Sequence, residues 1–307
     1  MLVSVSLYSR RYTFDARLQP IHMSMKEKRE AGHWRNPLSV ENTGAGTIAG
    51  SLTLGRELRR KTAAGVALGT FVIESPVPAT VAALALAGFD FVVLDMEHST
   101  VDFARLELLI AASQAAGLAT LVRPWGEDTG LIGKVLDMGA NGIMVPHVDS
   151  PERARAVVEQ ARYAPQGSRG LCPLTKYDAL AEPLQALNES TYVVIQIEGR
   201  KALGQMAAIA AVAGIDAVFV GPYDLAMSMG VPPGSAQVFA AAQKLAGSVP
   251  HGPTLGIYID DPAKCADWAA RRFALQVVSF DGRMLSNGAR SVVTQARQGL
   301  RAGNAKT

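Results

Sequence analysis

Along the chain from Glu57 onward, short apolar runs of strand type alternate with longer segments whose apolar residues recur at helical spacing. The short runs are continuous rather than alternating, which is typical of strands buried on both faces of a parallel sheet. Strands are predicted at 66–72, 91–95, 119–123, 142–145, 192–197, 216–220, 254–259 and 275–280. Helical segments are predicted near 78–88, 103–116, 130–139, 150–161, 201–213, 236–248, 261–272 and 283–298, and a loop with a short helix at 163–190.

Eight such units in about 245 residues match the count and size of a (β/α)8 TIM barrel. Gly88, Gly117, Gly139 and Gly214 stand where helices should end, as C-terminal caps do. The alternative is a doubly wound open sheet, but no GxGxxG follows the first strand. The fold class predicted is therefore α/β, with the barrel domain at 56–307.

Residues 1–55 differ from the rest, because they are rich in Arg, Ser and Thr and show no steady periodicity. We expect a disordered or weakly ordered N-terminal extension there. The alternatives are an upstream start, with initiation at Met23 or Met25, and an organellar targeting segment, which the acidic residues of this stretch disfavour.

Composition narrows the function classes. The chain has 307 residues, 49% of them hydrophobic, which allows one large core. The net charge is +3 with no basic stripe among aromatics, which argues against nucleic acid as a partner. No apolar run reaches the roughly eighteen residues of a membrane span. Two cysteines without a CxxC argue against a disulfide framework and a thiolate zinc site, so a cytoplasmic location is expected.

Ionisable and polar side chains follow the ends of several predicted strands. Because the carboxyl ends of parallel strands meet at one mouth of a barrel, these groups should share the place where barrel enzymes do chemistry. The residues concerned are Asp95, Glu97, His98, Arg123, His147, Gln196, Glu198 and Asp224. By contrast, Asp90 and Asp216 stand directly before strands and are expected to cap them.

Glu198 and Asp224 are the best candidate metal ligands. Two carboxylates without a thiolate or a histidine cluster favour a hard divalent cation, Mg2+ or Mn2+. Such an ion keeps open positions that the carboxylate and keto oxygens of a 2-oxo acid could fill, and as a Lewis acid it would stabilise an enolate. The alternative is that both carboxylates only cap helices or form salt bridges.

His98 is the candidate base, because the pKa of an imidazole suits proton transfer near neutrality. Arg123 would present a rigid cationic fork to a developing oxyanion. The alternative for Arg123 is a buried ion pair with Asp95 or Glu97.

Gln196 alternates with Glu198 along the fifth strand, so both face one side, and its amide could bind the substrate carboxylate. His147 follows Val145-Pro146, and its role stays open between a pocket wall and a catalytic part.

Several short motifs occur together with these residues. They are Asp95-Met-Glu-His98, Val122-Arg-Pro124, Leu136-Asp-Met-Gly139, Val145-Pro146, Arg162-Tyr-Ala-Pro165, Arg169-Gly170, Gln196-Ile-Glu198, Gly221-Pro-Tyr-Asp224 and Met229-Gly230. In their order and spacing, from about Leu68 to Gly230, the chain resembles the HpcH/HpaI aldolase family, the class II pyruvate-dependent aldolases. It resembles in particular the 4-hydroxy-2-oxoheptanedioate and 2-dehydro-3-deoxyglucarate aldolases.

The resemblance implies a metal-dependent lyase that cleaves a 4-hydroxy-2-oxo acid to pyruvate, or a related 2-oxo acid, and an aldehyde. No Schiff-base lysine is needed, and none stands at a strand end. The alternatives are an oxaloacetate-type decarboxylase, a citrate-lyase-like or malyl-CoA-lyase-like enzyme, and a non-catalytic barrel that binds an oxo acid. The resemblance also implies a role for each of these residues. Glu198 and Asp224 would be ligands of Mg2+, Mn2+ or Co2+, His98 the base, and Arg123 the group that stabilises the enolate. Gln196 and the backbone around Tyr223 would contact the substrate carboxylate, and Asp137 would be the aspartate that raises the basicity of the histidine.

Asp137 lies near the end of the third predicted helix. About eight helical residues at 1.5 Å each place it roughly 12 Å toward the opposite face from His98. We therefore hypothesise that it reaches the partner subunit's His98 in a homo-oligomer, a hexamer or trimer with exchanged terminal helices as the resemblance suggests. The alternative is an exposed helix carboxylate. Two departures from the family pattern are Met96, where many members have Gly, and Val278 to Arg283, which match no motif.

Overall fold

The computed structural model describes residues 48–126, 129–172, 183–249 and 251–304, with side chains described from Leu52 to Arg301. The prediction for the N-terminal extension falls, up to residue 47, outside the described residues.

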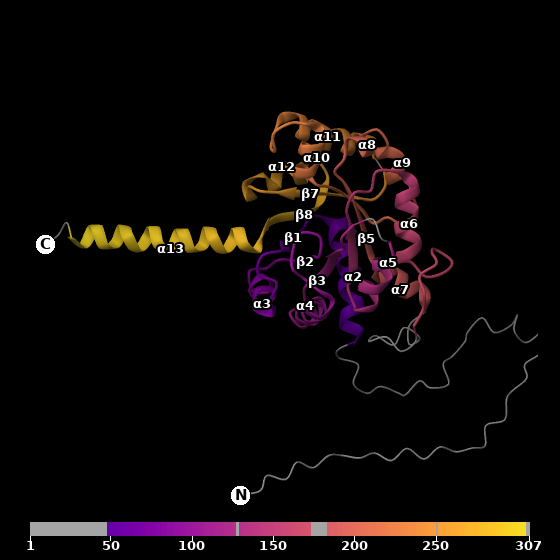
Figure 1. Ribbon diagram of the computed structural model, residues 1–307, viewed down its shortest axis with the longest axis horizontal. Helices are drawn as coiled ribbons and strands as arrows, with labels where there is room; N and C mark the ends of the chain where they lie inside the picture. Colours follow the sequence, from indigo (N-terminus) through magenta and orange to yellow (C-terminus); the bar gives the residue numbers. More distant parts are fainter. Residues whose placement is uncertain (1–47, 127–128, 173–182, 250, 305–307) are drawn as a thin grey trace, which may run out of the picture. The chain divides into compact units, whose positions relative to one another are not determined.

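Eight parallel strands close into a barrel in chain order, with β1 paired to both β2 and β8, which confirms the predicted fold class (Figure 1). The strands are β1 (Ala67–Val72), β2 (Phe91–Asp95), β3 (Ala119–Arg123), β4 (Gly142–Val145), β5 (Tyr192–Ile197), β6 (Ala217–Val220), β7 (Thr254–Ile259) and β8 (Phe273–Phe280).

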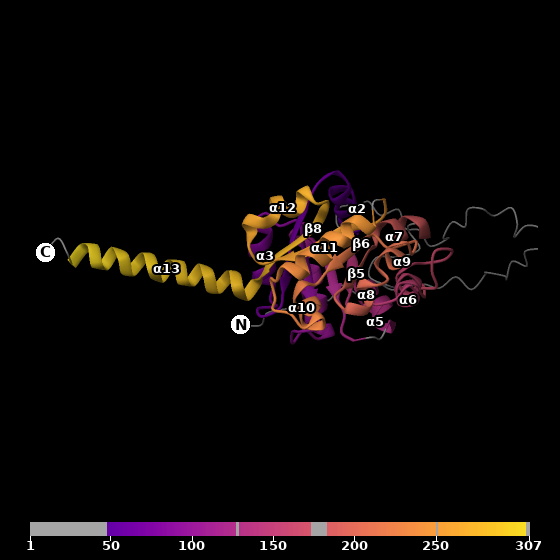
Figure 2. The same cartoon turned by 90° about the horizontal axis from the view of Figure 1, so that it is seen from above.

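Helices surround the barrel, except α13 (Asp281–Asn304), which extends away from it, as Figure 2 shows from a second direction. Those around the barrel include α3 (Pro78–Leu86), α4 (Phe103–Ala115), α5 (Gly130–Asp137), α6 (Pro151–Ala161), α7 (Leu184–Ser190), α8 (Arg200–Leu203), α9 (Met206–Ala210), α10 (Pro222–Met229), α11 (Ala236–Ser248), the 3-10 turn η1 (Pro262–Lys264) and α12 (Cys265–Ala270). None of the described helices combines the length and hydropathy that crossing a bilayer requires.

The strands are buried on both faces, as their continuous apolar runs predict, and each face packs into a different cluster. Val92 and Leu94 belong to the larger cluster, together with apolar side chains of the surrounding helices, whereas Phe91 and Val93 belong to a second cluster built mainly from strand residues. Side chains alternate across a strand, so this split assigns one cluster to the outside of the barrel and one to its inside. Both faces of the sheet are therefore fixed by apolar burial.

A helix that the sequence analysis did not anticipate, α2 (Ile48–Ala64), precedes the first strand. Residues 48–55, assigned above to the N-terminal extension, form its first turns. Leu54 and Leu58 of α2 pack into the inner cluster. Gly55 permits a close approach, because a Cβ there would lie 1.8 Å from the carbonyl oxygen of Ser190. The barrel domain therefore includes residues that the predicted boundary at 56 leaves out.

Other helices differ from their predictions. The helical segment at 201–213 is two short helices, α8 and α9, and α10 follows β6 where no helix was predicted. The unmatched segment at the end of β8 contains Asp281, whose carboxylate accepts hydrogen bonds from the backbone of Ile73, Glu74 and Ser75. This segment thus fixes the loop after β1.

The predicted glycine at a helix end is confirmed for Gly139, which adopts a φ of 100° directly after the C-cap of α5. Gly214 is not a helix cap, because α9 ends at Ala210 with Ala211 as its C-cap, and Gly214 instead adopts a φ of 94° in the turn before β6. Both conformations disfavour residues with a Cβ. Asp90 and Asp216 do bind strand starts, but not those of the strands that they precede. Their carboxylates accept the backbone N–H groups of Leu68 and Val193, at the starts of the neighbouring strands β1 and β5.

Candidate active site

The carboxyl ends of the strands surround a cavity of about 310 Å3. Five of the residues predicted from the sequence line it: His98, Arg123, Gln196, Tyr223 and Asp224. They come from β2 and its following loop, from β3, from β5 and from the first turn of α10. The barrel topology therefore assembles residues that are far apart in the chain.

Arg123, the last residue of β3, is held by two carboxylates. Its Nε and Nη2 donate to the two oxygens of Asp95 at 2.8 and 2.7 Å, and its Nε lies 3.3 Å from Oε2 of Glu97. The guanidinium also lies over the ring of Phe71, 4.5 Å from its centroid. The ion pair weighed as an alternative role is thus present, and it orients Arg123 at the cavity wall.

The pKa of Arg123 is raised above its ordinary value. Burial alone lowers this pKa, but the hydrogen bond to Asp95 and the charges of Asp95, Glu97 and Glu198 outweigh burial. The guanidinium therefore stays charged in a site from which water is largely excluded, where a fixed cation acts strongly on a nearby anion.

Glu198, directly after β5, is a buried carboxylate with several contacts. Its Oε1 accepts the backbone N–H of His147 at 2.7 Å and lies 3.1 Å from Nδ1 of the same residue. Its Oε2 accepts from Nε2 of Gln196 at 3.2 Å. Burial raises the pKa of Glu198 to about 7, with the charges of Asp224 and Glu97 adding to the rise and the contacts with His147 opposing it.

Space beside Glu198 is kept open by Gly221. A Cβ on this residue would lie 2.7 Å from Oε2 of Glu198, which real Cβ atoms essentially never do. Next to it, the buried Oε1 of Gln196 has no hydrogen-bond partner among the described residues. An unsatisfied acceptor next to a carboxylate of raised pKa marks a place that favours a cation or a donor.

A hard divalent cation fits this donor set. Glu198 and Asp224 offer carboxylate oxygens, and the charge of Asp224 adds to the burial that raises the pKa of Glu198, so a cation beside both would favour the charged form of Glu198. Within the described residues, no group of three or more His, Cys, Asp or Glu is arranged to hold a metal. Oxygens of substrate or water would have to complete the coordination.

His98 and His147 both stand next to Glu97. Nε2 of His98 lies 3.7 Å from Oε2 of Glu97, and the His98 side chain is 57% exposed, so it can reach solvent and substrate. Nε2 of His147 lies 3.1 Å from Oε1 of Glu97. His147 has a φ of 56°, a conformation that is uncommon outside glycine.

Glu97 had no predicted role of its own, and the role of His147 was open between a pocket wall and a catalytic part. A turn that places His147 in the left-handed region carries no signal recognisable in one sequence. The only sign in the sequence that Glu97 and His147 belong to the site is that both stand close to the ends of predicted strands.

Asp137 and Tyr223 have contacts of their own. Asp137 is the last residue of α5, and Nη2 of Arg169 lies 2.6 Å from its carboxylate within the same chain. It does not line the cavity that holds His98. Tyr223 does line it, and its hydroxyl donates to Asp260.

Comparison with known proteins decides what this arrangement belongs to. A sequence model of the HpcH/HpaI aldolase/citrate lyase family matches residues 68–287. The chain belongs to this family. It is 34% identical over 218 residues to the pyruvate aldolase of Rhizobium etli, an alignment covering 69% of this chain and 86% of that protein.

Solved structures share the fold at similar identity. The HpcH/HpaI aldolase of Desulfitobacterium hafniense is 29% identical with a TM-score of 0.72, over 78% of this chain and 96% of the other. Citrate synthase SbnG is 32% identical with a TM-score of 0.71, over 79% and 98%. The HpcH/HpaI chain described here is thus an aldolase or lyase, an enzyme that acts on carbon–carbon bonds.

Proposed function

We propose that this enzyme reversibly cleaves a 4-hydroxy-2-oxo acid to pyruvate, or a related 2-oxo acid, and an aldehyde, with Mg2+, Mn2+ or Co2+ held by Glu198 and Asp224. The observation that carries this is the buried carboxylate of Glu198, of raised pKa, beside Asp224, Arg123 and an unpaired acceptor of Gln196. The similarity to the pyruvate aldolase of Rhizobium etli supports pyruvate as the oxo acid.

The metal, when bound, would supply Lewis-acid stabilisation of the enolate oxygen. The protein's part begins with orienting the oxo acid. The backbone N–H groups at the start of α10, around Tyr223, point positive partial charge toward an anion, and this suits the substrate carboxylate. Gln196 lines the same wall, and its amide can hydrogen-bond that group.

Proton transfer falls to His98. Its exposed imidazole can take the proton of the 4-hydroxyl, through water, as the C3–C4 bond breaks. The electron pair of that bond passes into the pyruvate enolate while the C4 carbonyl of the aldehyde forms. Protonation at C3 then yields pyruvate, and synthesis runs in reverse.

Arg123 is placed to stabilise the negative charge that develops in this step. Asp95 and Glu97 occupy its Nε and Nη2, so the remaining Nη1 donors are available at the cavity wall. A donor fixed before the reaction needs no reorganisation when the charge appears. The carboxylate pair therefore contributes by holding the guanidinium in one orientation.

A second candidate is favoured by one similarity. The structure of citrate synthase SbnG, at 32% identity, fits a reaction on an oxaloacetate- or citrate-type acid, such as decarboxylation or a citrate-lyase-like or malyl-CoA-lyase-like cleavage. Incubation with 4-hydroxy-2-oxo acids, following pyruvate release, and with oxaloacetate, following CO2 release, separates the two. Pyruvate and aldehyde formation that EDTA abolishes and Mn2+ restores supports the aldolase; CO2 release alone refutes it.

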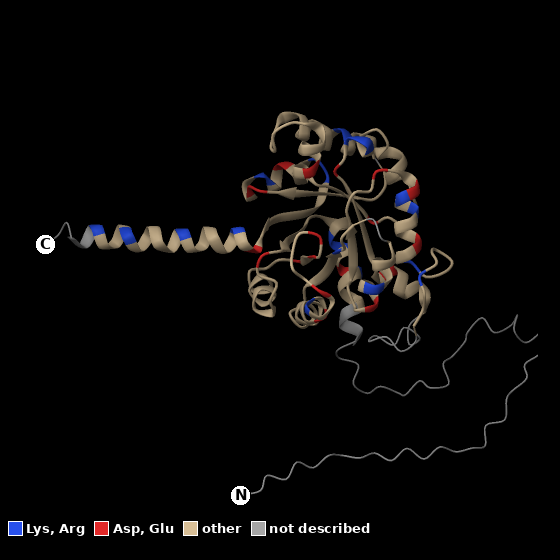
Figure 3. Cartoon of the chain, in the orientation of Figure 1, with Lys and Arg blue, Asp and Glu red and all other residues tan. Residues whose placement is uncertain are grey.

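We further propose that the working enzyme is a homo-oligomer, a hexamer or trimer. In Figure 1, α13 runs away from the barrel after β8, and it exposes the apolar side chains of Leu285, Val292, Val293 and Leu300. In Figure 3, basic residues are spaced along α13, whose one acidic residue is Asp281 at its start. A second copy is the occupant that would bury this apolar stripe.

The same oligomer would bring Asp137 to the partner subunit's His98. The measurement is sedimentation velocity of the wild type and of a Leu285→Glu/Val292→Glu variant, with the pH profile of Asp137→Asn beside it. A monomeric wild type would contradict the proposed oligomer. An Asp137→Asn enzyme with unchanged rate and pH profile would contradict the proposed contact of Asp137 with the partner subunit's His98.

A further inference from the structure

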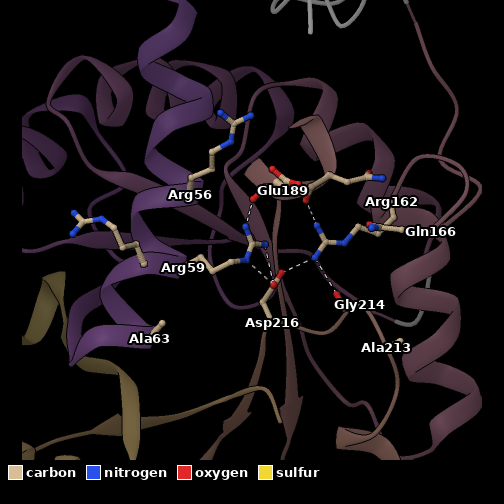
Figure 4. A pocket seen from close by; sticks show the side chains of 11 residues that line it. Arg56, Arg59, Ala63, Arg162, Gln166, Glu189, Ala213, Gly214 and Asp216 are labelled. Carbon is tan, nitrogen blue, oxygen red and sulfur yellow. Dashed lines mark hydrogen bonds and ion pairs between the residues drawn. The ribbon is translucent and has the colours of Figure 1, made fainter. Parts of the chain in front are cut away.

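A second cavity lies at the opposite end of the barrel from the active site. Its volume is about 670 Å3, and it is enclosed by α2, the end of α7 and the turn before β6 (Figure 4). Its wall contains four arginines and two acidic residues: Arg56, Arg59, Arg60, Arg162, Glu189 and Asp216. None of them belongs to the site described above.

Two of the arginines share one carboxylate at the centre of this cavity. Oδ1 of Asp216 accepts from Nε and Nη2 of Arg59 at 3.0 and 2.8 Å, and Oδ2 accepts from Nη2 of Arg162 at 2.6 Å (Figure 4). Oδ2 also accepts the backbone N–H of Val193 at 2.7 Å. Asp216 therefore has its acceptor sites filled and cannot neutralise further cations.

Donors remain in excess on this wall. Arg162 is 4% exposed, yet its Nε has no hydrogen-bond partner among the described residues. The guanidinium of Arg56 spends one donor, from Nη2, on the carbonyl of Ala186. Glu189, the other acid, already accepts from Gln185. Arg59 and Arg162 also donate to backbone carbonyls of the surrounding turns, so the donors left over include Nε of Arg162 and the other N–H groups of Arg56.

The charges of the lining side chains also favour an anion in this cavity. Four positive and two negative side chains line the cavity, and one of the cations is almost fully buried. Burial and the neighbouring charge of Arg59 lower the pKa of Arg162, while the charge and hydrogen bond of Asp216 oppose this decrease. A concave wall with excess positive charge concentrates anions.

We propose that this cavity is a binding site for a small multivalent oxyanion, a phosphate- or polycarboxylate-bearing molecule, held by Arg56 and Arg60 with the Arg59–Asp216–Arg162 cluster as its floor. Guanidinium groups bind both oxyanion classes through paired charge-assisted hydrogen bonds. The bound anion would tie α2 to the turn before β6 and so stabilise the bottom of the barrel by mass action. The site is separate from catalysis, and the proposal does not depend on the reaction.

The test is isothermal titration calorimetry of the full chain with pyrophosphate and with citrate, at constant ionic strength. Three variants are compared with wild type: Arg56→Gln/Arg60→Gln, the charge-matched Arg105→Gln/Arg155→Gln, and Asp224→Asn. Arg105 and Arg155 are exposed helix residues that do not line the cavity, and Asp224 belongs to the active site.

Saturable binding of one anion per chain is expected in wild type, in Arg105→Gln/Arg155→Gln and in Asp224→Asn. Affinity should fall about tenfold or more in Arg56→Gln/Arg60→Gln, as the loss of charge-assisted hydrogen bonds implies. Tighter binding of pyrophosphate than of citrate assigns the site to phosphates, and the reverse order to polycarboxylates. Affinity equal in wild type and Arg56→Gln/Arg60→Gln, or lost in Asp224→Asn, overturns the proposal.

Discussion

His147 holds Glu198 by its backbone and by its ring: its N–H donates to Oε1 of Glu198 at 2.7 Å, and its Nδ1 lies 3.1 Å from the same oxygen. The other ring nitrogen lies 3.1 Å from Glu97, which also contacts Arg123 and His98. The proposed metal ligand, the cation and the base are thus linked through two residues that the sequence analysis left without a role.

Replacing the His147 ring should loosen Glu198 without unfolding the barrel. In His147→Gly the backbone donor remains and the left-handed φ becomes unstrained, so only the ring contacts are lost. We expect metal affinity to fall about 10- to 100-fold, as for other residues that orient a ligand. The measurement is Mn2+ titration by calorimetry, with the melting temperature as control. An unchanged affinity would remove His147 from the site.

Arg123→Lys should separate charge from geometry. Lysine keeps the positive charge but cannot form the two parallel hydrogen bonds to Asp95 or aim a fixed donor into the cavity. We expect kcat to fall by about 10² to 10³, the range for removing one oriented donor. Deuterium exchange at C3 of pyruvate measures enolate formation directly. A rate within twofold of wild type would mean that positive charge alone suffices.

Gly221 offers a steric test of the space beside Glu198. A methyl group at this position would come within 2.7 Å of Oε2, whereas the same group on Gly199, next in sequence to Glu198, would meet nothing within 4 Å. We therefore expect Gly221→Ala to weaken Mn2+ binding by about 10-fold or more, on the scale of a displaced ligand, and Gly199→Ala to leave it unchanged. Equal affinities in the two variants would contradict this geometry.

Much of the fold was predictable because the strands are marked by burial on both faces. Five of the eight strand ranges match the structure, as for β3 at Ala119–Arg123. Of the other three, β1 and β6 begin one residue later than predicted, and β8 begins at Phe273 rather than 275. The elements that the pattern missed are those for which periodicity says little. Helix α10 begins at a glycine–proline pair, Gly221-Pro222, and such pairs are also typical of loops. Helices α8 and α9 are too short to repeat an apolar spacing.

The site was predictable to the extent that strand ends reveal it. His98, Arg123, Gln196 and Asp224 line one cavity because parallel strands bring their carboxyl ends together. What could not be predicted depends on tertiary contacts between distant loops. The pairing of Asp137 with Arg169, and the left-handed turn at His147, each depend on how a loop folds back.

Tyr192 should make the barrel sensitive to alkali. Burial raises its pKa to about 12, against contacts with Thr254 and Thr62 that lower it. Because the folded pKa exceeds the unfolded value near 10, the neutral phenol stabilises the fold at lower pH, and this contribution is lost as pH rises from about 10 through 12. Two pKa units correspond to about 2 to 3 kcal/mol of unfolding free energy.

Urea unfolding of wild type and Tyr192→Phe between pH 8 and 12 checks this. The variant loses the hydroxyl contact with Thr62 at every pH, so it should start less stable, and its stability should then decline less steeply above pH 10. Parallel pH dependences of the two proteins would show that Tyr192 does not ionise in the unfolding transition.

The central claim is that Glu198 and Asp224 together hold one divalent cation, and calorimetric titration of Mn2+ into wild type, Glu198→Gln and Asp224→Asn tests it most directly. Both replacements keep the size of the side chain and remove one negative charge. The account predicts one Mn2+ per active site in the wild type, and affinity lower by about 100-fold or more in each variant, since each loses a charged oxygen ligand of a hard cation. Mn2+ binding of equal affinity in all three proteins would contradict it.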